Sequence, residues 1–585
     1  MVIFDGDRKV FKLDTDNTSY VMGITEEGYL GNIYYGKKVD STDLVYAMRT
    51  GEHPFTPSKV PGEKISFMDK FPMEYPFAGT GDFRSSCINI RDNAGQEGLE
   101  LKYKSHNIYA EKRKIDGMPS ARGDGSMSLD IVLSDEALGA EVTLVYTVYE
   151  ECDIITRSVK VQNTSGKEFY ITKALSACLN LETDVSDILS LHGSWARERH
   201  IQRSKIEYGS YVTESLRGEP GHQDHPFIAV LSGNCSENCG DVYAMNLIYS
   251  GNFIARVQKD QFDKVRMSIG IHPEHFTWKL ESGQCFEMPE VIMQYSCKGT
   301  NGMTNNFHDF FRKYILPSKW VEAERPVLIN NWEATYFDFN DDKLVQIAEE
   351  ASKLGIDMLV MDDGWFGHRN ADNSSLGDWY VNEEKLKGGL KKLVDRVNAL
   401  GMKFGIWFEP EMISPDSDLY RSHPEWALAL DGREPGLCRT QYVLDFSRHE
   451  VVDYIYGRLH DILESANIEY VKWDMNRPIA EAASLSLPAD RQGEVMHRHV
   501  LALYELQERL VNDFPDLLLE NCSGGGARFD PGMLYYSPQI WCSDNADPVE
   551  RLMIQEGTHL IYPLSTTGTH VADSPNHVNG RITPF

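Results

Sequence analysis

The chain has 585 residues, of which 41% are hydrophobic and 11% are aromatic, so it is a folded protein too long for a single hydrophobic core. Acidic residues number 88 against 58 lysines and arginines, which gives a formal net charge of −30. This charge argues against nucleic acid and anionic membrane surfaces as partners and suits a neutral substrate.

The first residues, MVIFDGDRKV, show neither the basic segment nor the apolar run of a signal peptide. No window approaches eighteen continuous apolar residues, so no membrane span is predicted. The ten cysteines are scattered, and only Cys235 and Cys239 are closely spaced, which favours free thiols over a zinc site. These features predict a cytoplasmic protein.

Residues 1–300 are predicted to form an antiparallel β-sandwich. In the stretch 140–150 (AEVTLVYTVYE), alternate residues such as Val142 and Leu144 share one face, as in a half-buried strand. The stretch 158–169 passes through an Asn-Thr-Ser-Gly turn, and similar turns recur about every ten residues. Long helical periods are missing, which is typical of a sandwich.

Residues 301–324 are predicted to be a helical linker, and residues 325–585 a catalytic (β/α)8 barrel. In the latter region, eight candidate parallel strands are mostly separated by amphipathic helices. The strands are expected within PVLINNWEATY, DMLVMDDGWFG, KFGIWFEPEM, QYVLDFS, YVKWDMNR, LLLENCSGGG, QIWCSDN and LIYPLSTTGTHV. A doubly wound nucleotide-binding sheet is the competing architecture, but the turn after the first strand has no glycine-rich loop.

Polar and aromatic side chains stand at the carboxyl ends of these strands. They are Asp362, Asp363, Trp407, Glu409, Lys472, Asp474, Asn521, Cys522 and Asp544. One such residue is commonly a helix cap, but six strands that all end this way indicate an active site at the barrel rim.

Two of these carboxylates have different surroundings, as glycoside cleavage requires. Lys472 and Asp474 point to the same face of a strand, so the lysine charge should keep the aspartate ionised. Asp544 lies near Trp541 with no cation beside it in the sequence before Arg551, a setting in which a carboxyl group can retain its proton. Asp547 is the competing candidate, although it is better placed to cap a helix beginning at Pro548.

Several motifs resemble those of retaining α-galactosidases of glycoside hydrolase family 36, in the same order along the chain. They are MDDGWFG with LGDW, FGIWFEPEM, KWDMNR, ENCSGGGARFD and WCSDN, together with GTGDFR and SLRGEPGHQDHPF in the amino half. The resemblance implies hydrolysis of terminal α-linked galactose from oligosaccharides such as melibiose and raffinose. It also implies a homo-oligomer, a tetramer in the family, and a last barrel helix and C-terminal β-domain that this chain is expected to lack.

The resemblance further implies that Asp474 is the nucleophile and Asp544 the acid and base. Residues implied to bind the substrate are Trp332, Asp362, Asp363, Trp407, Arg439, Lys472, Asn476, Cys522, Gly525 and Trp541. No cofactor or metal is expected, because no histidine or third carboxylate follows Asp362 and Asp363 at ligand spacing. Glu409 and Glu411 are expected to make hydrogen bonds at the rim.

Three alternatives remain open at the level of sequence. Galactosyl transfer uses the same residues and differs in the access of water. Cleavage of α-N-acetylgalactosamine needs room beside the sugar 2-position, where Cys522 and Gly525 favour a hydroxyl group. A catalytically inactive galactoside-binding protein is the third, and the presence of both carboxylates argues against it.

Overall fold

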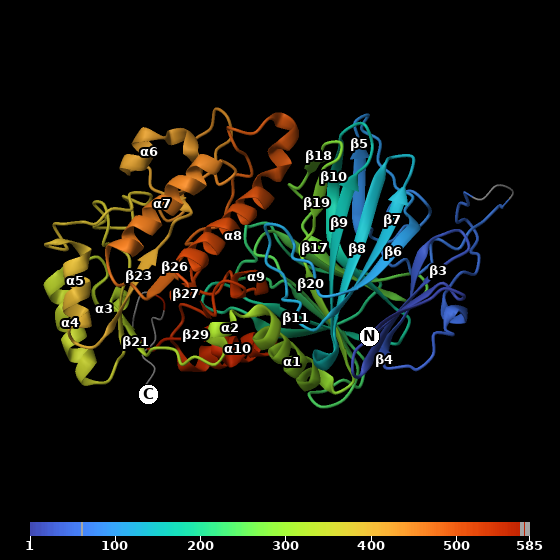
Figure 1. Ribbon diagram of the computed structural model, residues 1–585, viewed down its shortest axis with the longest axis horizontal. Coiled ribbons are helices and arrows are strands. Elements are labelled where there is room, and N and C mark those ends of the chain that lie inside the picture. Colours follow the sequence, from blue (N-terminus) through green and yellow to red (C-terminus); the bar gives the residue numbers. More distant parts are fainter. Residues whose placement is uncertain (60–62, 574–577, 579–585) are drawn as a thin grey trace.

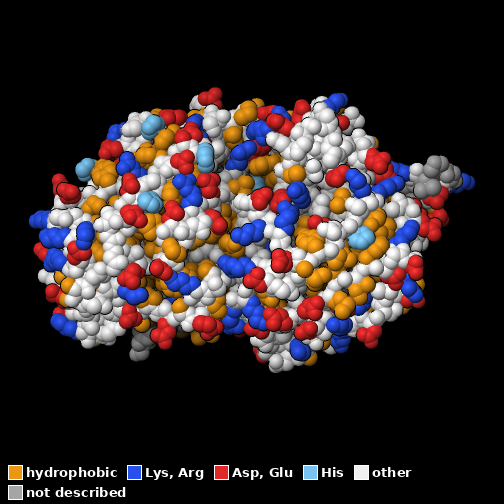
Figure 2. Space-filling view, in the orientation of Figure 1, with side chains coloured by type: hydrophobic (Ala, Val, Ile, Leu, Met, Phe, Trp, Pro, Cys, Tyr) orange, Lys and Arg blue, Asp and Glu red, His pale blue; other side chains and the backbone are white. Residues whose placement is uncertain are grey.

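The structure, a computed structural model, describes residues 1–59, 63–573 and 578. Figure 1 shows an amino half made of strands beside a carboxyl half in which helices surround shorter strands. On the face drawn in Figure 2, acidic and basic side chains are interspersed among apolar ones. Within the described residues, none of the helices is long and apolar enough to cross a membrane.

The described part of the amino half consists of antiparallel sheets, as predicted. A 4-stranded sheet contains β1 (Val2–Asp5), β2 (Val10–Asp14), β3 (Thr18–Ile24) and β4 (Leu30–Lys37). A 6-stranded sheet contains β13 (Gly209–Ser215), β16 (Phe253–Lys259), β17 (Val265–Ile271), β10 (Phe169–Leu181) and β18 (Trp278–Leu280), with β5 (Ile88–Asp92) also paired to β10. A 10-stranded sheet contains β12 (His200–Lys205), β11 (Asp187–His192), β14 (Phe227–Leu231), β15 (Val242–Leu247), β20 (Val291–Ser296), β9 (Ile154–Asn163), β8 (Ala140–Tyr149), β7 (Met127–Asp135) and β6 (Lys102–Ala110), with β19 (Cys285–Glu287) paired to β9.

The two larger sheets pack against each other through buried side chains. Strand β9 contacts β10, and β14 and β15 contact β16 and β17. The predicted inner face of β8 is confirmed, since Val142, Leu144, Tyr146 and Val148 are at most 1% exposed. Burial of this apolar surface, at roughly 25 cal/mol per Å², stabilises the sandwich.

The carboxyl half contains a 7-stranded parallel sheet among the described residues. Its order is β21 (Leu328–Asn330), β22 (Met358–Met361), β23 (Lys403–Phe408), β26 (Tyr470–Trp473), β27 (Leu518–Asn521), β28 (Gln539–Trp541) and β29 (Thr567–Gly568). The prediction of a parallel strand within QYVLDFS is wrong: β25 (Tyr442–Val443) pairs antiparallel with β24 (Met412–Ile413), and β23 pairs directly with β26. The short apolar run is buried against a loop strand instead of the sheet.

Helices connect the parallel strands and join the two halves. They are α1 (Gly299–Phe310), α2 (Ser318–Val321), α3 (Trp332–Thr335), α4 (Asp341–Lys353), α5 (Gly389–Asn398), α6 (Asp418–Ser422), α7 (His449–Ser465), α8 (Val495–Asp513), α9 (Pro531–Leu534) and α10 (Pro548–His559). The prediction of helices between parallel strands is confirmed, for example, by α4, which lies between β21 and β22 in the chain. The side chain of Asn340 caps it by accepting from the N–H of Lys343. In such a parallel sheet the carboxyl ends of the strands lie at one edge, and the predicted polar side chains therefore meet there.

Candidate active site

Asp474, the predicted nucleophile, directly follows β26 and accepts three hydrogen bonds. Its Oδ2 accepts from Trp407 Nε1 at 3.1 Å and from Asn476 Nδ2 at 2.8 Å, and its Oδ1 accepts from the backbone N–H of Met475 at 3.0 Å. Burial opposes ionisation, but the charge of Lys472 and these hydrogen bonds hold the pKa of Asp474 below its usual range. The carboxylate is therefore charged at neutral pH, as a nucleophile must be.

Lys472 links three strand ends. Its Nζ lies 3.2 Å from Oδ2 of Asp362, which also accepts from Asn330 Nδ2 at 2.6 Å. Burial disfavours the ammonium group, but the neighbouring carboxylates, with that of Asp362 contributing most, hold the pKa of Lys472 well above its usual range. The same Nζ lies 5.2 Å from the ring centroid of Trp541, within the range of a cation–π contact. The lysine thus stays charged beside both Asp474 and β28.

Asp544, the predicted acid and base, follows β28 and is held by two indole groups. Oδ1 accepts from Trp541 Nε1 at 3.0 Å, and Oδ2 accepts from Trp195 Nε1 at 3.0 Å. Trp541 belongs to the same strand end, whereas Trp195 comes from the connection between β11 and β12 in the amino half. Each carboxylate oxygen therefore has one N–H donor.

The two catalytic candidates share their charged neighbours. Lys472 and Arg439 each interact electrostatically with both Asp474 and Asp544. Cys522, which directly follows β27 between β26 and β28, interacts with both carboxylates as well. Local sequence does not place Lys472 or Arg439 beside Asp544, and in the structure both cations act on Asp544 as well as on Asp474.

The glycine run after β27 packs tightly against the Asp544 loop. Gly525 has a φ of +96°, and a Cβ built on it would lie 2.7 Å from Glu198 Oε1 and 3.2 Å from the backbone nitrogen of Asp544. A Cβ on Gly526 would lie 2.3 Å from the carbonyl oxygen of Cys542. Only glycine fits here, because both space and backbone conformation exclude a side chain at position 525.

Asp363 has an internal partner. Its Oδ1 and Oδ2 accept from Arg369 Nε and Nη2, each at 2.8 Å, in a buried bidentate pair. Burial raises the pKa of Asp363, and the guanidinium opposes this shift. Of the two adjacent aspartates, Asp362 thus pairs with the lysine beside the nucleophile and Asp363 holds Arg369.

The strand-end tryptophans divide into buried and partly exposed rings. Trp365 and Trp407 are 0% and 2% exposed, and Trp365 Nε1 donates to the carbonyl of Trp407 at 3.0 Å. Trp332 and Trp541 are half-buried. Trp332 packs edge-on against Tyr336, with ring centroids 5.2 Å apart. The half-buried rings keep surface available for a sugar face.

Glu409 and Glu411, which are expected to make hydrogen bonds at the rim, are 1% and 0% exposed. Glu409 Oε1 accepts from the N–H of Asn476 at 2.6 Å and from Gln441 Nε2 at 2.8 Å. Burial and the nearby charge of Asp474 raise the pKa of Glu409 to about 7. Both glutamates lie on the segment after β23, and Glu409 holds the backbone that follows Asp474.

Sequence reasoning missed the contribution of the amino half. Besides Trp195, Glu198 Oε2 accepts from Ser543 Oγ at 2.6 Å, and His222 Nε2 lies 2.7 Å from the carbonyl oxygen of Gly524. His222 belongs to the SLRGEPGHQDHPF motif, so this motif could have indicated that the amino half contributes to the site. Trp195 and Glu198 lie in a short turn with no catalytic pattern of its own.

The cap prediction for Asp547 is confirmed. Its Oδ1 accepts from the backbone N–H groups of Val549 and Glu550 at 2.9 and 3.2 Å, at the start of α10. Pro548 occupies the first helical turn, where a missing N–H carries no cost. Asp547 is therefore engaged in capping, and Asp544 remains the carboxylate of this loop that interacts with Lys472.

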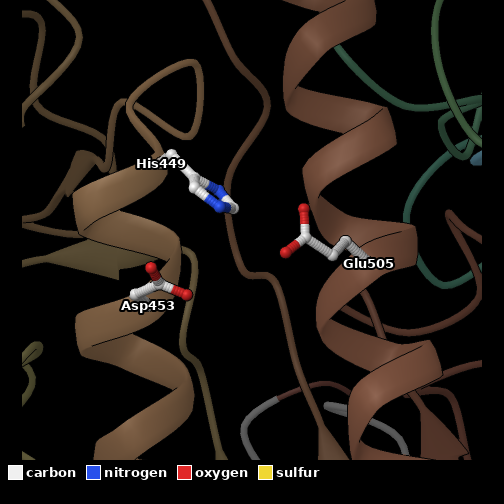
Figure 3. Close-up of side chains that lie close together, drawn as sticks. All are labelled: His449, Asp453 and Glu505. Carbon is white, nitrogen blue, oxygen red and sulfur yellow. The ribbon is translucent and has the colours of Figure 1, made fainter.

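A cluster that resembles a cation site lies away from these residues. Figure 3 shows His449 and Asp453 on α7 facing Glu505 on α8, with potential ligand atoms within 4.8 Å of one another. Arg509 Nη1 already lies 2.8 Å from Asp453 and 3.5 Å from Glu505. The guanidinium of Arg509 therefore already neutralises part of the negative charge that a metal ion would neutralise.

Comparison with known proteins agrees with this geometry. Residues 28–281 match the model of the glycosyl hydrolase family 36 N-terminal domain, and residues 285–585 match the melibiase model. The chain belongs to glycoside hydrolase family 36. It is 45% identical to the α-galactosidase AgaA of Geobacillus stearothermophilus over 99% of its own length and 80% of that protein.

Solved family 36 structures are also closely similar. The α-galactosidase AgaB from the same bacterium has 45% identity and a TM-score of 0.97, covering 100% of this chain and 81% of AgaB. A variant of AgaA in complex with raffinose has 45% identity and a TM-score of 0.96, covering 98% of this chain and 81% of that protein. The family 36 assignment therefore holds for sequence and fold alike.

Proposed function

We propose that this chain is a retaining exo-α-galactosidase that hydrolyses terminal α-linked galactose from melibiose- and raffinose-type oligosaccharides. The observation that carries the proposal is that Lys472 and Arg439 each act electrostatically on both Asp474 and Asp544, so the two carboxylates share the same charged neighbours. Family membership and the raffinose complex of the AgaA variant support the choice of sugar. We expect the two carboxyl groups to lie about 5 to 5.5 Å apart, as in retaining enzymes.

In the first step, a carboxylate oxygen of Asp474 attacks the anomeric carbon while Asp544 donates its proton to the glycosidic oxygen. The bond from C1 to this oxygen breaks, and the leaving sugar departs with a hydroxyl group. Trp407 and Asn476 hold the attacking carboxylate in place through their hydrogen bonds. This orientation lowers the barrier because little motion is needed at the moment of attack.

In the second step, Asp544 takes a proton from water, and the water oxygen attacks C1. The bond between C1 and Asp474 breaks, which frees α-galactose and restores both carboxyl groups. Asp362, Asp363, Arg439 and Lys472 are proposed to bind the hydroxyl groups, with Asp363 acting through the guanidinium of Arg369. Trp332, Trp407 and Trp541 are proposed to line the sugar.

Selectivity for galactose over its 2-acetamido derivative is proposed to arise beside β27. Cys522 is 2% exposed, and burial raises the pKa of its thiol well above the usual range, so the thiol is neutral. Gly525 has no space for a side chain, because a Cβ there would meet Glu198 and Asp544. A rigid, close wall of this kind suits a hydroxyl group better than an acetamido group.

The parallel sheet is proposed to be part of a closed (β/α)8 barrel. The elements that follow its two edge strands approach each other: His570 Nε2, after β29, lies 3.7 Å from Glu333 Oε2, after β21. We also propose a cytoplasmic homo-oligomer, in keeping with the family. Size-exclusion chromatography with light scattering measures the assembly directly.

A proton-NMR time course on melibiose tests the proposal. We expect free galactose to appear first as the α-anomer, because two displacements at C1 preserve its configuration. Asp474→Ala should bind melibiose without releasing galactose. Release of β-galactose first, or normal turnover by this variant, would contradict the mechanism. Galactosyl products with an added acceptor would favour transfer.

A further inference from the structure

Trp195 is a large, half-exposed aromatic residue with a specific polar contact. It is 48% exposed, and its Nε1 donates to Asp544 Oδ2 at 3.0 Å across 349 residues of sequence. Packing alone does not account for such a ring, because much of its surface contacts no protein. Its indole N–H instead ends on the carboxylate that serves as acid and base in the proposed function.

The turn that carries Trp195 is fixed by buried contacts with the catalytic half. Glu198, at 0% exposure, accepts from Ser543 Oγ at 2.6 Å. Arg199 donates to the carbonyl oxygens of Cys542 and Gly526 at 2.6 and 2.7 Å. The turn that carries the indole is thus held against Cys542 and Ser543, the two residues before Asp544, and against Gly526.

We propose that Trp195 is a positioning residue for the acid and base, an inference that rests on the proposed function. An indole N–H only donates, so Trp195 and Trp541 each occupy one lone pair on a different oxygen of Asp544. Two donors fix the plane of the carboxyl group. The catalytic proton then occupies one of the two lone pairs that remain and points at a defined position for the leaving oxygen.

Trp195→Phe tests this role, because it keeps an aromatic ring and removes the N–H. We expect kcat/KM for melibiose, whose leaving group needs a proton, to fall by about tenfold or more, as for a lost hydrogen bond to a charged group. The value for 2,4-dinitrophenyl α-galactoside should stay unchanged, because its leaving group departs without a proton. Trp195→His, which retains a ring N–H, should recover part of the melibiose activity.

Trp278→Phe is the matched control, since Trp278 lies in β18 of the amino half and packs against Phe286. It should affect neither substrate. Equal losses on both substrates in Trp195→Phe, or full melibiose activity in that variant, would overturn the positioning role. If the parent protein releases no galactose at all, the proposed function itself fails, which is a separate result.

Discussion

Lys472→Met removes a cation that has two roles in the site. Its ion pair with Asp362 contributes to stability, and its charge lowers the pKa of Asp474. The Lys472 Nζ lies 3.2 Å from Asp362 Oδ2, a distance at which two unit charges attract by about 5 kcal/mol at an effective dielectric constant of about 20. Removing one partner of a buried pair leaves the other uncompensated and typically costs about 3–5 kcal/mol of stability. We expect a loss of that size in urea-induced unfolding.

The same change should shift the pH dependence of catalysis. The charge of Lys472 helps to hold the pKa of Asp474 below its usual range. Without that charge the pKa of Asp474 rises, so the acid limb of the kcat/KM profile should move to higher pH. In the double variant with Asp362→Asn, stability should recover while the acid limb stays displaced. An unchanged acid limb and an unchanged free energy of unfolding in Lys472→Met would refute this account.

Three further predictions follow from the same contacts. Asp544→Ala should lose activity on melibiose but keep the first step on 2,4-dinitrophenyl α-galactoside. Added azide should then restore turnover and yield α-galactosyl azide. Formation of the β-azide would contradict the proposed role of Asp544. The pKa of Glu409 is raised from 4.5 in the unfolded chain to about 7 in the folded protein. Between these two pH values the folded state keeps a proton that the unfolded state has lost. The contribution of Glu409 to stability is therefore full below about pH 4.5 and is lost as the pH rises to about 7. Glu409→Gln should flatten that decrease, worth up to about 3 kcal/mol, in urea titrations across this range. Gly525→Ala should cost about 1–2 kcal/mol of stability from its left-handed backbone alone and reduce kcat for melibiose by displacing Asp544; wild-type kinetics would show that the loop yields without consequence.

The sequence was sufficient to predict contacts between residues that lie close together in the chain. The two-residue spacing of Lys472 and Asp474 predicts a shared face, and the charge of the lysine acts on the aspartate in the structure. The cap at Asp547 was likewise predictable, because side chain and helix start are adjacent in the chain.

Contacts between residues far apart in the chain could not be predicted from local sequence. The contact between Trp195 and Asp544 joins residues far apart in sequence, and no periodicity marks either one for the other. The segment containing Tyr442 and Val443 has the apolar pattern of a barrel strand, yet tertiary packing pairs it with β24. A run of three apolar residues carries too little information to choose between these partners.

The active site therefore does not belong to the parallel-sheet half alone. A Cβ on Gly557 in α10 would lie 1.7 Å from the carbonyl oxygen of Arg199, so the turn of the amino half is packed against this helix without spare room. The same turn makes hydrogen bonds to Ser543 and to the carbonyl of Cys542, the two residues that follow β28. Removing this turn would leave Ser543 Oγ and the carbonyl of Cys542 without these partners, each at a cost of about 1–3 kcal/mol. The sandwich is thus a structural part of the candidate active site, and its turn holds the loop that carries Asp544.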